Sequence, residues 1–217
     1  MANQAKIPTY RILGSSGLRV YPLSLGTMTF GSSDELFSKN GITSEYEEAE
    51  KIFIKYVSIG GNFIDTANFY QSGTILLQNA LILQGQSEEW IAKIIQKNNI
   101  DRERLIIATK YSLPMVSGDP NAAGNNKKNL FRSVRDSLRR LQTDYIDILY
   151  VHFWDWSVDI RDLMKDLHEV VLSGKVLHIA ASDIPAWVVA TGNTYAQEHG
   201  LSKFICYQGL FFPINFF

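Results

Sequence analysis

The sequence predicts an α/β protein built around a parallel sheet. Three observations lead to this prediction: six short, nearly continuous apolar runs, amphipathic helical patterns between them, and the regular alternation of the two. Nearly continuous apolar runs are typical of strands that are covered on both faces. An alternating order of strands and helices predicts parallel strands joined by helical crossovers. A barrel and an open doubly wound sheet both satisfy this order, although the G-x-G-x-x-G motif typical of open dinucleotide-binding sheets is absent.

The apolar runs predict where the six strands lie. They are LSLGTM, FID, LIIAT, IDILYV, VLHIAA and FICYQ, which begin at Leu23, Phe63, Leu105, Ile146, Val176 and Phe204. Ahead of them, YRILGSSGLRVYPL predicts two short strands around a turn that contains glycine. We expect this hairpin to close the bottom of a barrel.

Helical patterns occupy intervals between the predicted strands. One apolar stripe extends from Tyr46 to Val57, and the spacing of Ser44 and Glu47 predicts a capping box at its start. Two further stripes are Leu130, Val134, Leu138 and Leu141, and then Leu163, Leu167 and Val170. Pro185 suits the first turn of another helix.

Composition limits the kinds of partner. The 217 residues are 46% hydrophobic and 20% charged, which is sufficient for a packed core. A net charge of −1 without a basic stripe gives no footprint for nucleic acid. The chain has no apolar window of about 18 residues, no signal-peptide run at its start, and one cysteine, Cys206. We therefore expect one cytoplasmic domain over residues 1–217, without a membrane or nucleic-acid partner.

Polar residues end five successive predicted strands. In chain order they are Asp65, Lys110, His152, Ser182 with Asp183, and Gln208. The catalytic groups of parallel barrels lie at the C-terminal ends of the strands. Each residue alone has an ordinary structural interpretation, such as a turn-capping acid, a solvated lysine or a structural histidine. Together with Tyr70, however, an acid, a cation, an imidazole and a phenol would share one rim, which favours a common site.

The chemistry of that rim predicts a proton donor. A free tyrosine has a pKa of about 10 and is a poor acid at neutral pH. An ammonium group favours the phenolate, and Lys110 supplies one if its side chain reaches Tyr70. Asp65 would keep Lys110 charged, and His152 would donate a hydrogen bond to a carbonyl oxygen. None of these side chains supplies electrons, so a reduction needs a cofactor that carries hydride.

Motifs for other chemistries are incomplete. The stretch HEVVL at His168 resembles half of a zinc-protease helix, but Leu172 stands where the second histidine is needed. The sequence has neither a G-x-S-x-G nucleophile elbow nor a G-x-x-x-x-G-K-[ST] phosphate loop. We expect no metal site.

The sequence resembles the aldo-keto reductase family, in particular its branch of fungal aryl-alcohol dehydrogenases and norsolorinic acid reductase-like proteins. The matching stretches, spread from about Tyr10 to Gly209, are PLSLGTMTFG, GGNFIDTANFY, ATKY, SLRRLQTDYIDILYVHFWD, GKVLHIAASDIPAWVV and YQG. The resemblance implies a TIM (β/α)8-barrel type of fold and NADPH as the cofactor. It also implies that aldehydes or ketones, aromatic ones in this branch, are interconverted with alcohols.

The same resemblance implies roles for individual residues. The catalytic tetrad of the family falls on Asp65, Tyr70, Lys110 and His152, with Tyr70 as the general acid. Ser182, Asp183 and Gln208 match positions that hold the nicotinamide carboxamide. Gly26 and Thr27 match a loop near the cofactor, and Trp154 matches an aromatic residue near the substrate. The family more often has asparagine where Asp183 stands.

Two departures from the family pattern lead to further expectations. Relatives pass almost directly from a Gly-Thr pair to Ser-Glu-Glu-Trp, whereas residues 75–86 separate these elements here, so we expect an insertion. The last two β/α units of the family pattern are absent, which predicts an incomplete barrel of about six units, C-terminally truncated. This leaves two alternatives to an active reductase: an inactive fragment and a non-enzymatic, cofactor-binding regulatory protein of the same fold.

Overall fold

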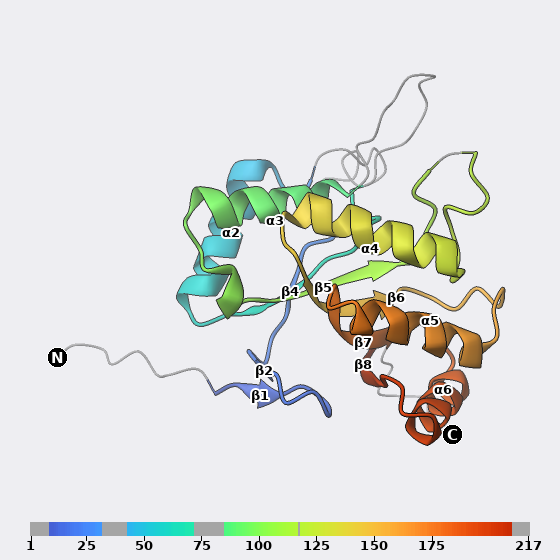
Figure 1. Ribbon diagram of the computed structural model, residues 1–217. Helices are drawn as coiled ribbons and strands as arrows, with labels where there is room; N and C mark the ends of the chain where they lie inside the picture. The colour runs from blue at the N-terminus through green and yellow to red at the C-terminus, as the bar shows by residue number, and fades with distance from the viewer. Residues whose placement is uncertain (1–8, 32–42, 72–84, 117, 210–217) are drawn as a thin grey trace, which may run out of the picture.

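The fold is a curled parallel sheet of six strands that follow one another in chain order (Figure 1). The computed structural model describes residues 9–31, 43–71, 85–116 and 118–209. The strands are β3 (Leu25–Gly26), β4 (Phe63–Asp65), β5 (Ile106–Tyr111), β6 (Ile146–Val151), β7 (Val176–Ser182) and β8 (Phe204–Gln208). A doubly wound sheet reverses its strand order at a switch point. The order β3-β4-β5-β6-β7-β8 has no reversal, so the sheet is of the barrel type and forms a half-barrel.

Helices fill the crossovers between the strands. They are α2 (Tyr46–Ser58), α3 (Gln86–Lys97), the 3-10 helix η1 (Arg102–Arg104), α4 (Lys127–Leu141), α5 (Ile160–Leu172) and α6 (Ala186–Glu198). The three predicted apolar stripes lie in α2, α4 and α5, and α6 begins directly after Pro185. Among the described residues, the helices are all too short or too polar to cross a membrane.

The start of α2 corrects one prediction. Ser44 does not cap the helix: Glu45 is the N-cap residue, and it makes no side-chain cap hydrogen bond. The Ser44 N–H instead donates to the Thr29 carbonyl at 2.8 Å, so this residue is used to pair with the loop after β3. Of the predicted insertion, residues 75–84 lie outside the described residues, while Gly85 and Gln86 form the N-cap and first residue of α3.

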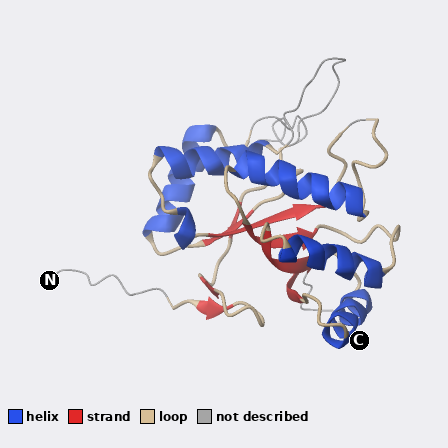
Figure 2. Ribbon diagram, in the orientation of Figure 1, coloured by secondary structure: helices blue, strands red, loops and turns tan. Residues whose placement is uncertain are grey.

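The two faces of the sheet carry different side chains. Successive residues of a strand point to opposite faces. On β5, Ile107 packs with the helices in an outer cluster, whereas Ala108 belongs to an inner cluster with Tyr150 and Ala180. The helices wrap the outer side, and the N-terminal hairpin lies on the other side (Figure 2). The inner face therefore receives the side chains that could form a site in a barrel.

The predicted hairpin is confirmed and covers part of the inner face. Its strands β1 (Arg11–Ile12) and β2 (Arg19–Val20) pair antiparallel. Leu13 and Leu18, from the connecting turn, pack against the inner cluster. Asn62, which precedes β4, ties the hairpin down by accepting from Tyr21 N–H at 2.7 Å and donating to the Arg19 carbonyl at 2.9 Å. The hairpin thus sits at the N-terminal ends of the strands, as expected for a plug.

Gly14 allows the hairpin to approach β8, which gives a test of this packing. A Cβ atom at Gly14, where φ is +52°, would clash with the Ile205 carbonyl oxygen, whereas a Cβ at Gly17 (φ +76°) would meet no atom of the described residues within 4 Å. Both Gly→Ala substitutions impose left-handed strain of roughly 1 kcal/mol. We expect Gly14→Ala to reduce the free energy of unfolding in urea by at least about 1 kcal/mol more than Gly17→Ala. Equal losses would show that the hairpin does not pack on β8.

Candidate active site

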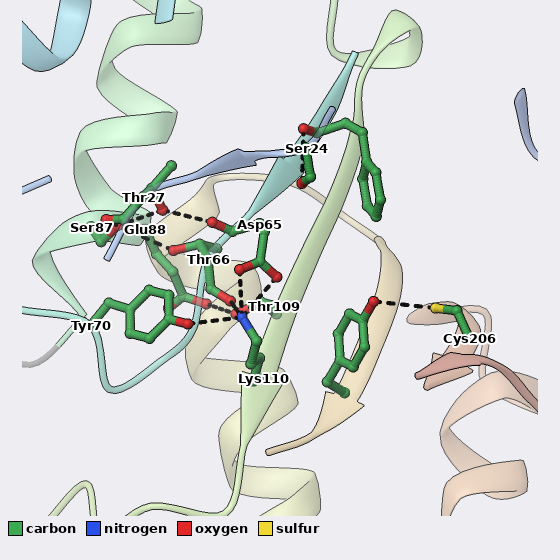
Figure 3. Close-up of polar contacts among 12 residues, drawn as sticks. Ser24, Thr27, Asp65, Thr66, Tyr70, Ser87, Glu88, Thr109, Lys110 and Cys206 are labelled. Carbon is green, nitrogen blue, oxygen red and sulfur yellow. Dashed lines mark hydrogen bonds and ion pairs between the residues drawn. The ribbon is translucent and has the colours of Figure 1, made fainter. Parts of the chain in front are cut away.

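Lys110 is the centre of a polar cluster at the C-terminal ends of β4 and β5. Its Nζ lies 2.7 and 2.8 Å from the two Asp65 carboxylate oxygens, 2.9 Å from the Thr66 carbonyl and 3.0 Å from Tyr70 Oη (Figure 3). Only 1% of Lys110 is exposed. A buried ammonium ion is strongly unfavourable unless it is paired and hydrogen-bonded. Asp65 therefore keeps Lys110 charged at this depth, and the ammonium in turn contacts the phenol.

The sheet register explains why these residues meet. Asp65 ends β4 and pairs with Ala108 of β5, so Lys110, two residues further, lies on the same inner face. Beyond the strand, Thr66 N–H donates to the Ala108 carbonyl at 2.9 Å and Asn68 N–H to the Lys110 carbonyl at 3.1 Å. These bonds tether the loop after Asp65 to β5. The loop can therefore carry Tyr70 back over the lysine.

His152 completes the predicted group of four. It follows β6, and its ring centroid is 6.0 Å from that of Tyr70, edge to face. Burial, with a further contribution from the Lys110 ammonium, lowers the pKa of His152 from its ordinary 6.5 to about 4. The imidazole is therefore neutral at pH 7. Its Nδ1 is buried and has no hydrogen-bond partner among the described residues.

A second phenol, Tyr150, also lies on the inner face but has a different environment. Its hydroxyl is 3.2 Å from Cys206 Sγ, and its ring centroid is 5.7 Å from Lys110 Nζ. Burial raises the pKa of Tyr150 well above the ordinary value, and burial also raises the pKa of Cys206. Both groups stay protonated at neutral pH. Of these two phenols, Tyr70 alone has its oxygen bonded to the ammonium.

The predicted cofactor residues fall into two groups on the same rim. Ser182 and Gln208 are register partners at the ends of β7 and β8, and Asp183 N–H donates to the Gln208 carbonyl at 3.1 Å. At the end of β3, the Thr27 N–H and hydroxyl both donate to the Asp65 carbonyl, at 2.9 and 3.0 Å. A Cβ atom at Gly26 would meet no atom of the described residues within 4 Å.

The structure places Trp154 differently from the other predicted site residues. It is 9% exposed and belongs to a second cluster between the sheet and the helices, formed mainly by residues of β6, β7, α4 and α5. Its ring centroid is 6.1 Å from that of Trp156, which is exposed. Within the described chain, no hydrogen bond or ring contact joins Trp154 to the group formed by Lys110, Asp65, Tyr70 and His152. The structure thus gathers Asp65, Lys110, Tyr70 and His152, but it does not bring Trp154 to them.

Sequence reasoning missed several polar residues that support this cluster. Thr66 provides a carbonyl acceptor for Lys110, and its hydroxyl donates to Ser87 of α3 at 3.2 Å. Glu88, also of α3, accepts from Thr109 at 2.6 Å. The signal in the sequence is the Ser-Glu-Glu-Trp stretch at residues 87–90, which contains both Ser87 and Glu88.

Comparison with known proteins decides the family. The model of the Aldo/keto reductase family matches residues 22–215. This chain belongs to the aldo/keto reductase family. Members of the family fold as TIM barrels, are oxidoreductases that act on carbonyl or alcohol groups and use a nicotinamide cofactor, and the six-stranded half-barrel agrees with that fold.

Curated relatives of this aldo/keto reductase chain are fungal. Norsolorinic acid reductase B of Dothistroma septosporum is 40% identical over 214 residues, which cover 96% of this chain and 50% of that protein. A norsolorinic acid reductase of Emericella nidulans is 42% identical over 206 residues, covering 92% and 49%. An aryl-alcohol dehydrogenase of Pestalotiopsis microspora is 39% identical over 206 residues, also covering 92% and 49%. The chain spans about half the length of the curated relatives it matches.

The environment of His152 in this aldo/keto reductase chain predicts a specific titration. We expect the NMR signals of the His152 imidazole to titrate with a midpoint of about 4 in the folded chain, and near the ordinary 6.5 in urea. Between these values the unfolded chain binds a proton that the folded chain excludes. This histidine's contribution to stability is therefore complete above pH 6.5 and is lost as the pH falls toward 4. A folded-state midpoint near 6.5 would contradict the buried, Lys110-facing position.

Proposed function

We propose that this chain carries the catalytic machinery of an NADPH-dependent aldo-keto reductase that interconverts aldehydes or ketones with alcohols. The observation that supports this proposal most directly is the 3.0 Å contact between Lys110 Nζ and Tyr70 Oη, on a lysine already held by the Asp65 carboxylate. An ammonium within hydrogen-bond distance stabilises a phenolate. Tyr70 is therefore the general acid in the reductive direction and the general base in the oxidative direction.

The residues at the ends of β7 and β8 suit a nicotinamide carboxamide. Such a group needs both hydrogen-bond donors and acceptors, and the Ser182 hydroxyl, the Asp183 carboxylate and the Gln208 side-chain amide offer both. Gly26 at the end of β3 is exposed and has no side chain, so it would leave room for the cofactor at this rim. When bound, NADPH supplies the hydride that none of these side chains can provide.

Proton transfer then follows from the positions of the protein groups. Tyr70 Oη donates its proton to the carbonyl oxygen of the substrate as negative charge develops there. Lys110 stabilises the phenolate that remains, and the Asp65 carboxylate keeps the buried lysine paired before and after the proton leaves. In the reverse direction the phenolate removes the proton of the alcohol.

His152 orients the substrate oxygen. Because its pKa is about 4, the imidazole is neutral and can donate a hydrogen bond without competing with Tyr70 as the acid. Its edge-to-face position beside Tyr70 supports a role in which both side chains donate to the same substrate oxygen. Two donors converging on one oxygen stabilise the charge that develops there.

The substrate class is proposed from the relatives. They include norsolorinic acid reductases and an aryl-alcohol dehydrogenase, which indicates aromatic carbonyl compounds and aromatic alcohols.

Replacing the Tyr70 hydroxyl tests the assignment of the acid. We expect Tyr70→Phe to reduce the rate of aromatic aldehyde reduction by roughly 10²–10⁴-fold, because general acid catalysis is lost. Tyr145→Phe is the matched control, because this half-buried tyrosine precedes β6 at the opposite end of the sheet. Rates would be followed by NADPH absorbance and cofactor binding by NADPH fluorescence.

The outcomes separate this proposal from its alternatives. Full activity in Tyr70→Phe would overturn the role of Tyr70. In the unsubstituted chain, NADPH binding without turnover of any aldehyde would favour a regulatory protein. No binding at all would favour an inactive fragment.

A further inference from the structure

The first turn of α3 sends two adjacent polar side chains into the protein behind the tetrad. Ser87 and Glu88 are both fully buried, at 0% exposure. Buried polar groups are unfavourable unless every one is hydrogen-bonded. Their partners include Thr66, which directly follows Asp65, and Thr109, which directly precedes Lys110, although neither buried side chain belongs to the proposed chemistry.

Ser87 links the end of β3 to the residue that follows β4. Its hydroxyl donates to the Thr27 carbonyl at 2.7 Å and accepts from the Thr66 hydroxyl at 3.2 Å. The Thr27 hydroxyl in turn donates to the Asp65 carbonyl at 3.0 Å. The Ser87 hydroxyl also lies 2.8 Å from the Thr27 hydroxyl oxygen, so both oxygens of Thr27 are acceptors within its reach. The bonds have a single direction: Thr66 to Ser87, Ser87 to Thr27, and Thr27 to Asp65.

Both ends of this hydroxyl chain touch the partners of Lys110. At one end, the Asp65 backbone is fixed beside the carboxylate that pairs with Nζ. At the other end, Thr66 is held through its hydroxyl while its carbonyl accepts from Nζ at 2.9 Å. Ser87 itself does not contact Nζ or Tyr70 in any recorded bond of the described residues.

Glu88 anchors the same helical turn to the neighbouring strand. It accepts from the Thr109 hydroxyl at 2.6 Å and from Arg140 Nε at 2.6 Å, and Arg140 is 7% exposed. Thr109 precedes Lys110 on β5 and points to the opposite face of the sheet. Glu88 thus fixes this helical turn to β5. Ser87 is therefore held in a defined position, from which it bonds Thr66 and Thr27.

We propose that Ser87 is a positioning residue that sets the Asp65 and Thr66 acceptors around the Lys110 ammonium. The inference rests on the proposed function of the tetrad, but the geometry that it concerns can be measured without turnover. A neutral hydrogen bond typically contributes on the order of a factor of five to an equilibrium. Loss of the Ser87 hydroxyl should therefore loosen the Lys110 shell without unfolding the chain.

The test measures hydrogen exchange of the Lys110 ammonium by ¹H–¹⁵N NMR of lysine side chains. Lys110 donates to three residues and is 1% exposed, so its ammonium signal should be protected in the unsubstituted chain. We expect Ser87→Ala to accelerate the exchange of this signal roughly five- to tenfold. Thr66→Val, which removes the hydroxyl that donates to Ser87 at nearly constant volume, should accelerate the exchange to a similar extent. In the double variant, the increase in the Lys110 exchange rate should be smaller than the product of the two single increases, because both substitutions break the same chain of hydrogen bonds.

Ser24→Ala is the matched control. Ser24 directly precedes β3, and its hydroxyl donates to a backbone carbonyl, that of Phe63 on β4, at 3.2 Å, but it is exposed and takes no part in the hydroxyl chain. We expect the Lys110 exchange rate to be unchanged by Ser24→Ala. If the chain reduces aldehydes, Ser87→Ala should in addition lower kcat several-fold and leave KM within about twofold, since the residue does not touch substrate.

Three results would overturn the proposal. They are an unprotected Lys110 signal in the unsubstituted chain, equal exchange rates in Ser87→Ala and Ser24→Ala, and a Thr66→Val variant that behaves like the unsubstituted chain. If Ser87→Ala fails to fold, Thr66→Val decides alone. A chain without reductase activity whose Lys110 exchange still responds to Ser87→Ala would contradict the proposed function and support the positioning role.

Discussion

The structure depends on one buried ion pair, that of Lys110 with Asp65. Both residues come from strands that neighbour each other in the sheet, and the lysine is almost fully buried. Separating such a pair typically costs 3–5 kcal/mol, because one charge is left without compensation. The pair is therefore formed only if β4 and β5 keep their register. The same register ties down the loop that carries Tyr70, so the fold and the site are specified by one set of contacts.

A second buried ion pair lies on the other face of β5. Glu88 and Arg140 join α3 to α4, and Thr109 connects them to the strand between. Thr109 and Lys110 are adjacent and point to opposite faces, so each face of the strand carries its own buried charge network. Helix α3 thus contacts the strand that carries Lys110, and this contact underlies the positioning role proposed for Ser87.

The inner face separates two phenols that composition alone cannot distinguish. Tyr150 is sealed beside Cys206 under the hairpin cluster, and burial keeps it protonated. Tyr70 is only partly buried, on a loop tethered to β5, and its oxygen faces the ammonium. The hairpin fills the bottom of the inner face with leucine, which leaves the C-terminal ends of the strands as the place for polar chemistry.

The sequence by itself determined the strands, most helices, the hairpin and the four residues around Lys110, because apolar periodicity and polar residues at strand ends are local signals. The alternation of strands and helices did not distinguish a barrel from an open doubly wound sheet, since both produce it. The strand order in the structure decided for the barrel type. The family resemblance predicts that Trp154 lies near the substrate; in the structure its side chain belongs to a cluster between the sheet and the helices, and its role stays a prediction. Only the tertiary structure revealed the roles of Ser87 and Glu88, because their partners lie 21 to 60 residues away in the chain. Hydrogen bonds over such separations leave no periodicity in the sequence, so they appear only when the strands and α3 are assembled.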